Sequence, residues 1–119
     1  MDKRKQTGQR GEALAAAYLR QKNYDVIERN WRCSVGELDI VALDKEILVF
    51  VEVRTRTGQR FGSAEESVTP AKQRRLIELA QSYLQTLDAP TPSWRIDVVA
   101  VLFGRGSPQI NHIENAVGW

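Results

Sequence analysis

Two successive apolar runs, 36–43 and 47–54, constrain the fold most, because each is interrupted by an acidic residue, Asp39 in the first and Glu52 in the second. The short break between the runs predicts a β-hairpin with a tight turn at Lys45-Glu46. Acidic residues are poor strand formers, and they are seldom buried unless they are paired or bound to a metal. A hairpin built from these runs therefore needs a partner for its two carboxylates.

Pairing Asp44 with Ile47 across the turn fixes the register of the whole hairpin. It puts Asp39 opposite Glu52 on one face, and it puts Glu37 opposite Arg54. The other face is apolar and consists of three pairs, Ala42 with Val49, Ile40 with Val51 and Leu38 with Val53. Like charges directly opposite one another on adjacent strands are destabilising. A Mg²⁺ ion, which is typically held by one or two carboxylates plus substrate phosphate, would compensate for the repulsion.

The composition is that of an ordinary globular protein, with 42% hydrophobic and 27% charged residues. At 119 residues we expect a single domain over 1–119. Cys33 is the only cysteine, which excludes an intrachain disulfide and a cysteine-based zinc site. No apolar segment follows the basic N-terminus, and no apolar stretch reaches about 18 residues, so we expect a cytoplasmic protein without a membrane segment.

Positive charge is concentrated in two parts of the chain. The N-terminal tail 1–8 is basic, and the segment 54–75 carries a net charge of +4, whereas the whole chain carries only +2. The positive charge of segment 54–75 is explained either by a solvated surface or by a strip that faces phosphates. The segment begins on the run that carries Glu52, which favours the phosphate-facing strip. The cations predicted to contact nucleic acid are Arg56, Arg60, Lys72 and Arg75.

Hydrophobic periodicity predicts an α/β domain with a central mixed β-sheet flanked by helices, in the order α-β-β-β-α-β-β. The helices are expected over 9–22 and from Thr69-Pro70 onward, and the strands over 24–31, the two hairpin runs, 94–103 and 109–113. Thr69 before Pro70 is a typical helix start. The intervening basic segment 55–69 is predicted to be a mobile loop, because loops of this length are usually functional or disordered.

Several other side chains are candidate site residues. Glu12 falls at the edge of the apolar arc of the first helix, within reach of a site on the sheet, although the helix dipole alone also favours a glutamate in the first turn. His112, the only histidine, is expected to be structural or at the surface. Asp97 is expected to support a site, to pair with Arg95 or Arg29, or to lie exposed at a sheet margin. The tryptophans are expected to pack in the core or at its rim rather than to stack on bases: Trp31, Trp94 and Trp119.

Motifs spread over nearly the whole chain carry a family resemblance. They are Gly11-Glu12, Arg29-Asn30, the segment 36–42, the segment 49–56, Phe61-Gly62, Glu66, Lys72, Tyr83-Leu84, the segment 95–98 and the segment 112–116. Together they resemble the YraN-like family of small bacterial proteins. That family is in turn similar to the PD-(D/E)xK nuclease superfamily, nearest to the archaeal Holliday-junction resolvases. The resemblance implies a restriction-endonuclease-like core.

Matched residue by residue, the resemblance implies that Glu12, Asp39, Glu52 and Arg54 are catalytic and that the first three hold Mg²⁺ or Mn²⁺. It implies an endonuclease that hydrolyses phosphodiester bonds in branched or structured DNA. A homodimer is expected as well, because the junction-cleaving relatives act as dimers.

Arg54 departs from the superfamily pattern, which usually has lysine at this position. Arginine stays protonated, so it can bind a phosphate but cannot act as a general base. An alternative function is therefore a non-catalytic nucleic-acid-binding module that keeps the nuclease-like fold. A scaffolding domain whose carboxylates form structural ion pairs, such as Glu37 with Arg54, is the third possibility.

Overall fold

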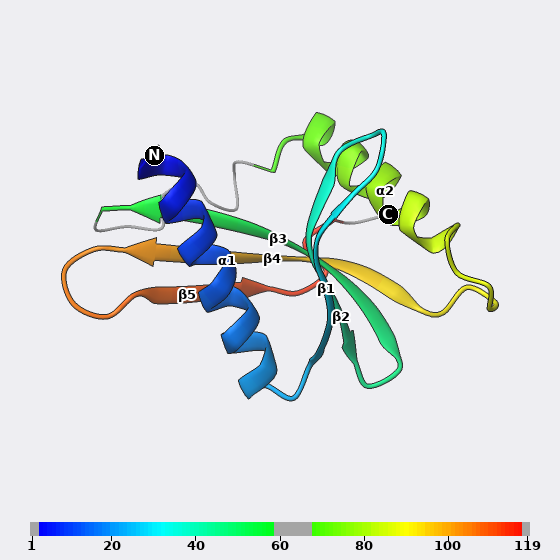
Figure 1. Cartoon of the computed structure of the whole chain (residues 1–119), viewed down its shortest axis with the longest axis horizontal. Helices are drawn as coiled ribbons and strands as arrows, with labels where there is room; N and C mark the ends of the chain where they lie inside the picture. The colour runs from blue at the N-terminus through cyan, green and yellow to red at the C-terminus, as the bar shows by residue number, and fades with distance from the viewer. Residues whose placement is uncertain (1–2, 59–67, 118–119) are drawn as a thin grey trace.

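Five strands form one sheet in the order β1-β2-β3-β4-β5, in a computed structural model that describes residues 3–58 and 68–117 (Figure 1). β3 and β4 are parallel, and the other neighbouring strands are antiparallel. The elements are α1 (Lys3–Gln21), β1 (Asp25–Arg32), β2 (Glu37–Asp44), β3 (Ile47–Thr57), α2 (Pro70–Leu84), β4 (Trp94–Phe103) and β5 (Gln109–Ile113). This arrangement confirms the predicted mixed α/β fold and its order of elements.

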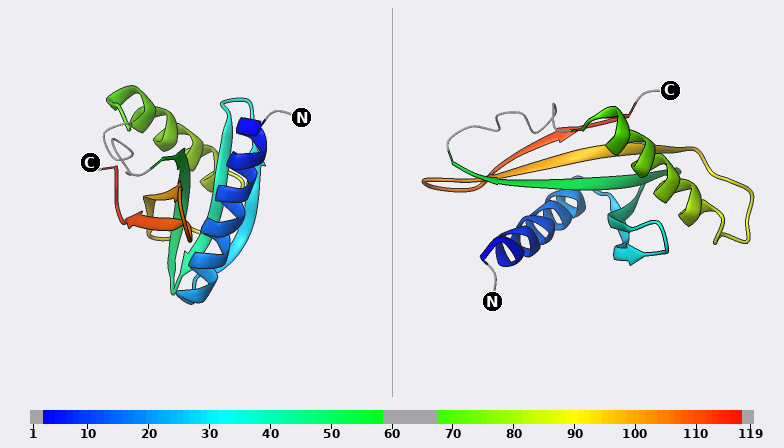
Figure 2. Two further views of the ribbon diagram at one scale, coloured as in Figure 1. Left: turned by 90° about the vertical axis from the view of Figure 1, so that its left-hand side faces the viewer. Right: turned by 90° about the horizontal axis from the view of Figure 1, so that it is seen from above.

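The two helices cover opposite faces of the sheet (Figure 2). The α1 cluster consists of Ala15, Ala16, Leu19, Tyr24, Ile40, Ala42, Val49, Val51, Val99 and Val101. The α2 cluster consists of Leu38, Val41, Leu48, Phe50, Leu76, Leu79, Ala80, Tyr83, Ile96 and Val117. Successive residues of β3 thus enter different clusters, and β4 contributes residues to both. Burial on both faces explains why the sequences of these strands are nearly continuous apolar runs. Among the described residues, no helix is both long and apolar enough to cross a membrane.

Two aromatic residues that could have been base-stacking platforms are engaged within the protein. Trp31 packs edge-on against Tyr83, with ring centroids 5.2 Å apart, and Trp94 packs edge-on against Phe50 at 5.7 Å. The predicted packing role is confirmed for both, and Trp119 lies outside the described residues.

α2 begins at the residue that the sequence predicts. The Thr69 side chain accepts a hydrogen bond from the backbone N–H of Lys72 at 3.2 Å, and Pro70 occupies the first helical position. This cap satisfies one of the free N–H groups of the first turn, and proline tolerates the position because its missing N–H would be unpaired there.

Two predicted boundaries were wrong. α1 begins at Lys3, so the described part of the basic tail is helical; lysine, arginine and glutamine are good helix formers, but this polar stretch has no apolar periodicity to show it. β3 continues to Thr57, because its parallel ladder with β4 extends to the pair Thr57–Phe103. The predicted loop 55–69 therefore starts later, and most of it, including Arg60, lies outside the described residues.

Candidate functional site

The candidate site lies where β2 separates from β3. Pairing of these strands follows the predicted register from Asp44–Ile47 to Ile40–Val51 and ends there, whereas β2 stays paired with β1 as far as Glu37. Leu38 packs in the α2 cluster, while Val53 packs against the α1 cluster, so the predicted pair of these two residues was wrong. Backbone groups that lose their ladder partner at such a separation need new hydrogen bonds.

Asp39 fills the gap between the two strands. Its Oδ2 accepts a hydrogen bond from the backbone N–H of Val53 at 2.8 Å, so a carboxylate replaces the carbonyl that β2 no longer supplies. Burial, a hydrogen bond to the Glu52 side chain and the charge of Glu52 raise the pKa of Asp39 to about 8. The predicted pair of carboxylates is therefore present, although the backbone ladder stops just before it.

A third acidic residue, Glu37, joins Glu12 and Asp39. One carboxylate oxygen from each of the three lies within 4.8 Å of the others. Mg²⁺ binds oxygen at about 2.1 Å, so two opposite ligands of one ion lie about 4 Å apart. The donor set and its spacing therefore fit one hard divalent cation. Burial and the charges of Asp39 and Glu37 raise the pKa of Glu12, and this rise outweighs the opposite effects of the Arg29 charge and the Asn30 hydrogen bond.

Glu52 does not belong to this group of three. Val51 and Val53 pack on the α1 side, and side chains alternate along a regular strand, so Glu52 and Arg54 point to the opposite face. Glu52 contacts the group through Asp39. Of the predicted ligands, the structure thus brings Glu12 and Asp39 together and places Glu52 on the far side of Asp39.

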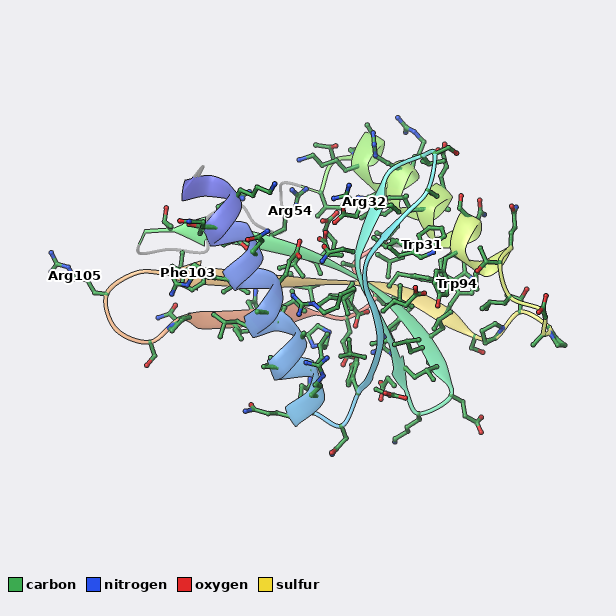
Figure 3. All side chains as sticks on the ribbon, viewed as in Figure 1. Trp31, Arg32, Arg54, Trp94, Phe103 and Arg105 are labelled. Carbon is green, nitrogen blue, oxygen red and sulfur yellow. The ribbon has the colours of Figure 1, made fainter. Side chains whose placement is uncertain are left out.

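Glu37 was not predicted as a ligand, because the predicted register places it opposite Arg54. That ion pair was wrong: Glu37 Oε2 lies 2.9 Å from Nε of Arg32, its partner on β1. The buried Nε of Arg54 has no hydrogen-bond partner among the described residues. Figure 3 shows Arg32 at the end of β1 and Arg54 on β3, with Arg105 far from both at the tip of the β4–β5 turn.

Asn30, which lies on β1, forms hydrogen bonds with two of the three carboxylates. With its amide nitrogen turned toward them, it donates to Glu37 Oε1 at 2.8 Å and to Glu12 Oε2 at 2.9 Å. Its φ of 56° is in the left-handed region, which asparagine adopts more readily than most residues. This donor offsets part of the repulsion between the two glutamates. The sequence held one signal for this role of Asn30: asparagine is a poor strand former, yet it occurs within a predicted strand.

The close approach of α1 to β3 positions Glu12. A Cβ atom at Gly11 would overlap Oγ1 of Thr55, so the helix can lie this near the strand only because residue 11 has no side chain. Glu12 is the next residue along the helix. A larger residue at position 11 would push the first half of α1, with its glutamate, away from Asp39.

We expect Gly11→Ala to lower the free energy of unfolding by about 1–3 kcal/mol, the usual cost of overpacking. Gly8→Ala, one turn earlier with nothing within 4 Å of its added methyl group, is the matched control. It should raise stability by about 0.5–1 kcal/mol through helix propensity. Urea unfolding followed by circular dichroism measures both. Thr55→Ala should recover part of the Gly11→Ala loss, and an equal response at both glycines would rule out the close contact.

Two pockets formed by the described residues bear on the predicted nucleic-acid contacts, and only one of them contains any of these contacts. The α1 pocket, of about 330 Å³, is lined by Lys5, Gly8, Gln9, Glu12, Asn30, Arg32 and Glu37. The α2 pocket, of about 650 Å³, is lined by Val35, Ala71, Lys72, Arg74, Arg75 and Glu78. Lys72 and Arg75 thus lie together, whereas Arg56 lies on β3, where its Nη1 donates to the Thr55 carbonyl at 3.2 Å. Arg60 is outside the described residues.

A five-stranded mixed sheet with acidic side chains gathered where two inner strands separate defines a small α/β protein with a candidate cation site. The model of the Uncharacterised protein family UPF0102 matches residues 11–101, and the chain belongs to this family. This result confirms the resemblance to the YraN-like proteins at the level of the family.

Relatives in this family match nearly the full length of the chain. A UPF0102 protein of Mycolicibacterium gilvum is 50% identical over 116 residues, which cover 95% of this chain and 94% of the relative. One from Herpetosiphon aurantiacus is 47% identical over 117 residues, with 95% and 94% covered. One from Roseiflexus castenholzii is 47% identical over 118 residues, with 97% and 95% covered.

Proposed function

We propose that this protein is a metal-dependent endonuclease that hydrolyses phosphodiester bonds in branched or otherwise structured DNA. The observation that carries the proposal is the group of Glu12, Glu37 and Asp39, whose oxygens lie within 4.8 Å of one another beside a pocket that contains two cations. Oxygen ligands suit Mg²⁺ or Mn²⁺, and cations suit phosphate. The resemblance to the PD-(D/E)xK superfamily and its restriction-endonuclease-like core supports the same chemistry.

In this mechanism Glu12 and Asp39 would hold Mg²⁺ or Mn²⁺ together with Glu37, with Glu52, or with both. When bound there, such an ion would polarise the phosphodiester, lower the pKa of a bound water and stabilise the leaving oxygen. The Val53 N–H fixes the Asp39 carboxylate, and the Asn30 amide fixes the two glutamates. Arg54, always protonated, contributes charge to the phosphate but cannot accept a proton.

Cleavage of four-way-junction, single-stranded and duplex DNA with millimolar Mn²⁺ tests the proposal. The isosteric Asp39→Asn substitution should lower the rate about 100-fold or more, because losing even an indirect support of a metal ligand costs about 10- to 100-fold. Glu46→Gln, in the exposed turn between β2 and β3, is the matched control and should cut like the wild type. Failure of the wild type to cut any of these DNA forms would reject an endonuclease.

The same variants identify the third ligand. Because Glu37 lies in the group of three and Glu52 does not, Glu37→Gln should weaken Mn²⁺ binding more than Glu52→Gln does. Calorimetric titration of Mn²⁺ into each protein measures the difference. If Glu52→Gln weakened Mn²⁺ binding more than Glu37→Gln, the ligands would be Glu12, Asp39 and Glu52, as the sequence resemblance implies.

A non-catalytic nucleic-acid-binding module is the second candidate. One observation favours it: Arg54 stands at the usual lysine position, and a guanidinium can bind a phosphate although it cannot accept a proton. Such a protein would give gel shifts that weaken steeply with salt. It would cut no DNA, and Asp39→Asn would leave its binding unchanged.

A further inference from the structure

We infer that the α1 pocket, and not the α2 pocket, seats the phosphate of the bound nucleic-acid strand beside the carboxylates, with Lys5, Gln9 and Arg32 as its contacts. This inference rests on the proposed function and adds the path of the strand: across the first half of α1 and the end of β1. None of these three contacts was predicted from the sequence.

Shared residues join the α1 pocket to the carboxylate group. Glu12 and Glu37 belong both to the lining of the pocket and to the group of three. A phosphate held in this pocket therefore lies directly beside the oxygens that would hold the cation. The acidic residue of the α2 pocket is Glu78, which is not one of the three carboxylates.

The walls of the α1 pocket offer hydrogen-bond donors suited to an anion. Lys5 is exposed and forms no ion pair with any residue that the structure describes. Arg32 Nε lies 2.9 Å from Glu37 Oε2, and the Arg32 side chain is 79% exposed, so this guanidinium is accessible from solvent. Gln9 adds an amide. Without such cations, the two glutamates of the pocket would repel a phosphate.

The dimensions and the construction of the α1 pocket fit the same ligand. Its volume of about 330 Å³ is within the range of sites for small molecules, roughly 300–1,000 Å³, and so accommodates a nucleotide-sized unit. One wall is a helix anchored on β3 by the Gly11–Thr55 contact, and the other is a paired strand. Both walls are therefore in place before the ligand binds, which lowers the entropic cost of binding.

One of the three cations that line the α2 pocket, Arg75, already has a structural partner. Arg75 Nη2 donates to the backbone carbonyl of Val35 at 2.9 Å and so ties α2 to the turn between β1 and β2. Using this guanidinium for a phosphate would compete with that bond. What distinguishes the α1 pocket is that it shares Glu12 and Glu37 with the carboxylate group, so a phosphate seated there lies beside that group.

Fluorescence anisotropy of labelled single-stranded and duplex DNA, measured over a range of salt concentrations with Ca²⁺ present, tests the inference. Lys5→Gln should reduce the salt dependence of binding by about one unit of slope, the loss expected for one phosphate contact. Arg20→Gln, which removes the same charge from the exposed last turn of α1, is the matched control and should change the slope little. Lys5→Arg should restore binding, and Lys72→Gln should behave like the control.

The outcomes separate this inference from the proposed function. Equal losses in Lys5→Gln and Arg20→Gln, or a loss confined to Lys72→Gln, would overturn the inference while leaving wild-type cleavage as evidence for a nuclease. Binding that depends on Lys5 without cleavage would uphold the inference and reject catalysis. Absence of DNA binding by the wild type at low salt would overturn both.

Discussion

Replacing Asp97 with alanine is expected to lower the free energy of unfolding by about 3–5 kcal/mol, because it strips a buried ionic network of its anion. Asp97 lies within β4 with 0% of its surface exposed. Its Oδ1 accepts from Arg95 Nε at 2.9 Å and from the Asn115 N–H at 2.9 Å, and its Oδ2 lies 2.8 Å from His112 Nε2. Burial raises the pKa of Asp97, but its bonds to His112 and Arg95 outweigh burial and lower it.

This network fastens distant parts of the chain to β4. His112 of β5 also contacts the Tyr18 hydroxyl of α1 through Nδ1 at 3.2 Å, and Arg95 reaches Asp44 of β2 at 3.2 Å. Without Asp97, the side chains of Arg95 and His112, only 14% and 3% exposed, would lose their anion while staying out of water. The cost comes mainly from these two stranded groups.

Thermal and urea unfolding of Asp97→Ala beside Asp88→Ala measures the effect. Asp88 is exposed after α2, and its substitution should change stability by less than about 0.5 kcal/mol. Asp97→Ala should lower the midpoint of thermal unfolding by about 10 °C or more. Asp97→Asn keeps a hydrogen-bond acceptor but loses the charge, so its loss of stability should lie between those of Asp88→Ala and Asp97→Ala. A loss below about 1 kcal/mol for the alanine variant would mean that the network does not hold the fold together.

Asp39→Asn is expected to become more stable than the wild type as the pH rises, when both are kept free of metal by a chelator. The folded-state pKa of Asp39 is raised to about 8 from the ordinary 3.8. The protonated form therefore favours folding, and this contribution is complete below about pH 4. It is lost as the pH rises through about 8, at up to about 1.4 kcal/mol per pH unit. Asparagine cannot ionise and avoids the loss.

Urea unfolding of both proteins at intervals between pH 5 and 9 tests this expectation, because the difference between them cancels groups that titrate alike. The advantage of Asp39→Asn should grow with pH and level off above about pH 8. Glu52→Gln, which removes the neighbouring charge but leaves Asp39 buried, should reduce the pH dependence without abolishing it. Parallel curves for Asp39→Asn and the wild type would show that Asp39 is ionised in the folded protein at neutral pH.

Local patterns predicted the parts of the fold that local physics determines. Alternation along the hairpin gave the pairs from Asp44–Ile47 to Ile40–Val51, and Thr69-Pro70 gave the start of α2. The error began at Asp39, where β2 follows β1 instead of β3. The separation of β2 from β3 depends on competition between β1 and β3 for pairing with β2. The sequence of the β2–β3 hairpin alone does not show how β1 pairs.

The candidate site shows the same division between local and distant information. Asp39 and Glu52 were found because acidic residues within apolar runs are unusual. Glu37 was missed because its neighbours, Arg32 and Asn30, come from β1, whose pairing was not predicted. The bond of Asp97 to Arg95, two residues away, was among the expected alternatives. Its contact with His112 on β5 required the folded sheet.

Because β4 pairs in parallel with β3 and helps to form the surface that α1 covers, we expect the carboxylate group to be completed only late in synthesis. Glu12, Glu37 and Asp39 all lie in the first third of the chain. α1 nevertheless docks on a surface that includes Val99 and Val101 of β4, and a parallel partner must return through a long crossover. When β2 has just emerged from the ribosome, the nascent chain would thus already contain Glu12, Glu37 and Asp39. α1 would not yet be docked, so the three carboxylates would not yet be brought together.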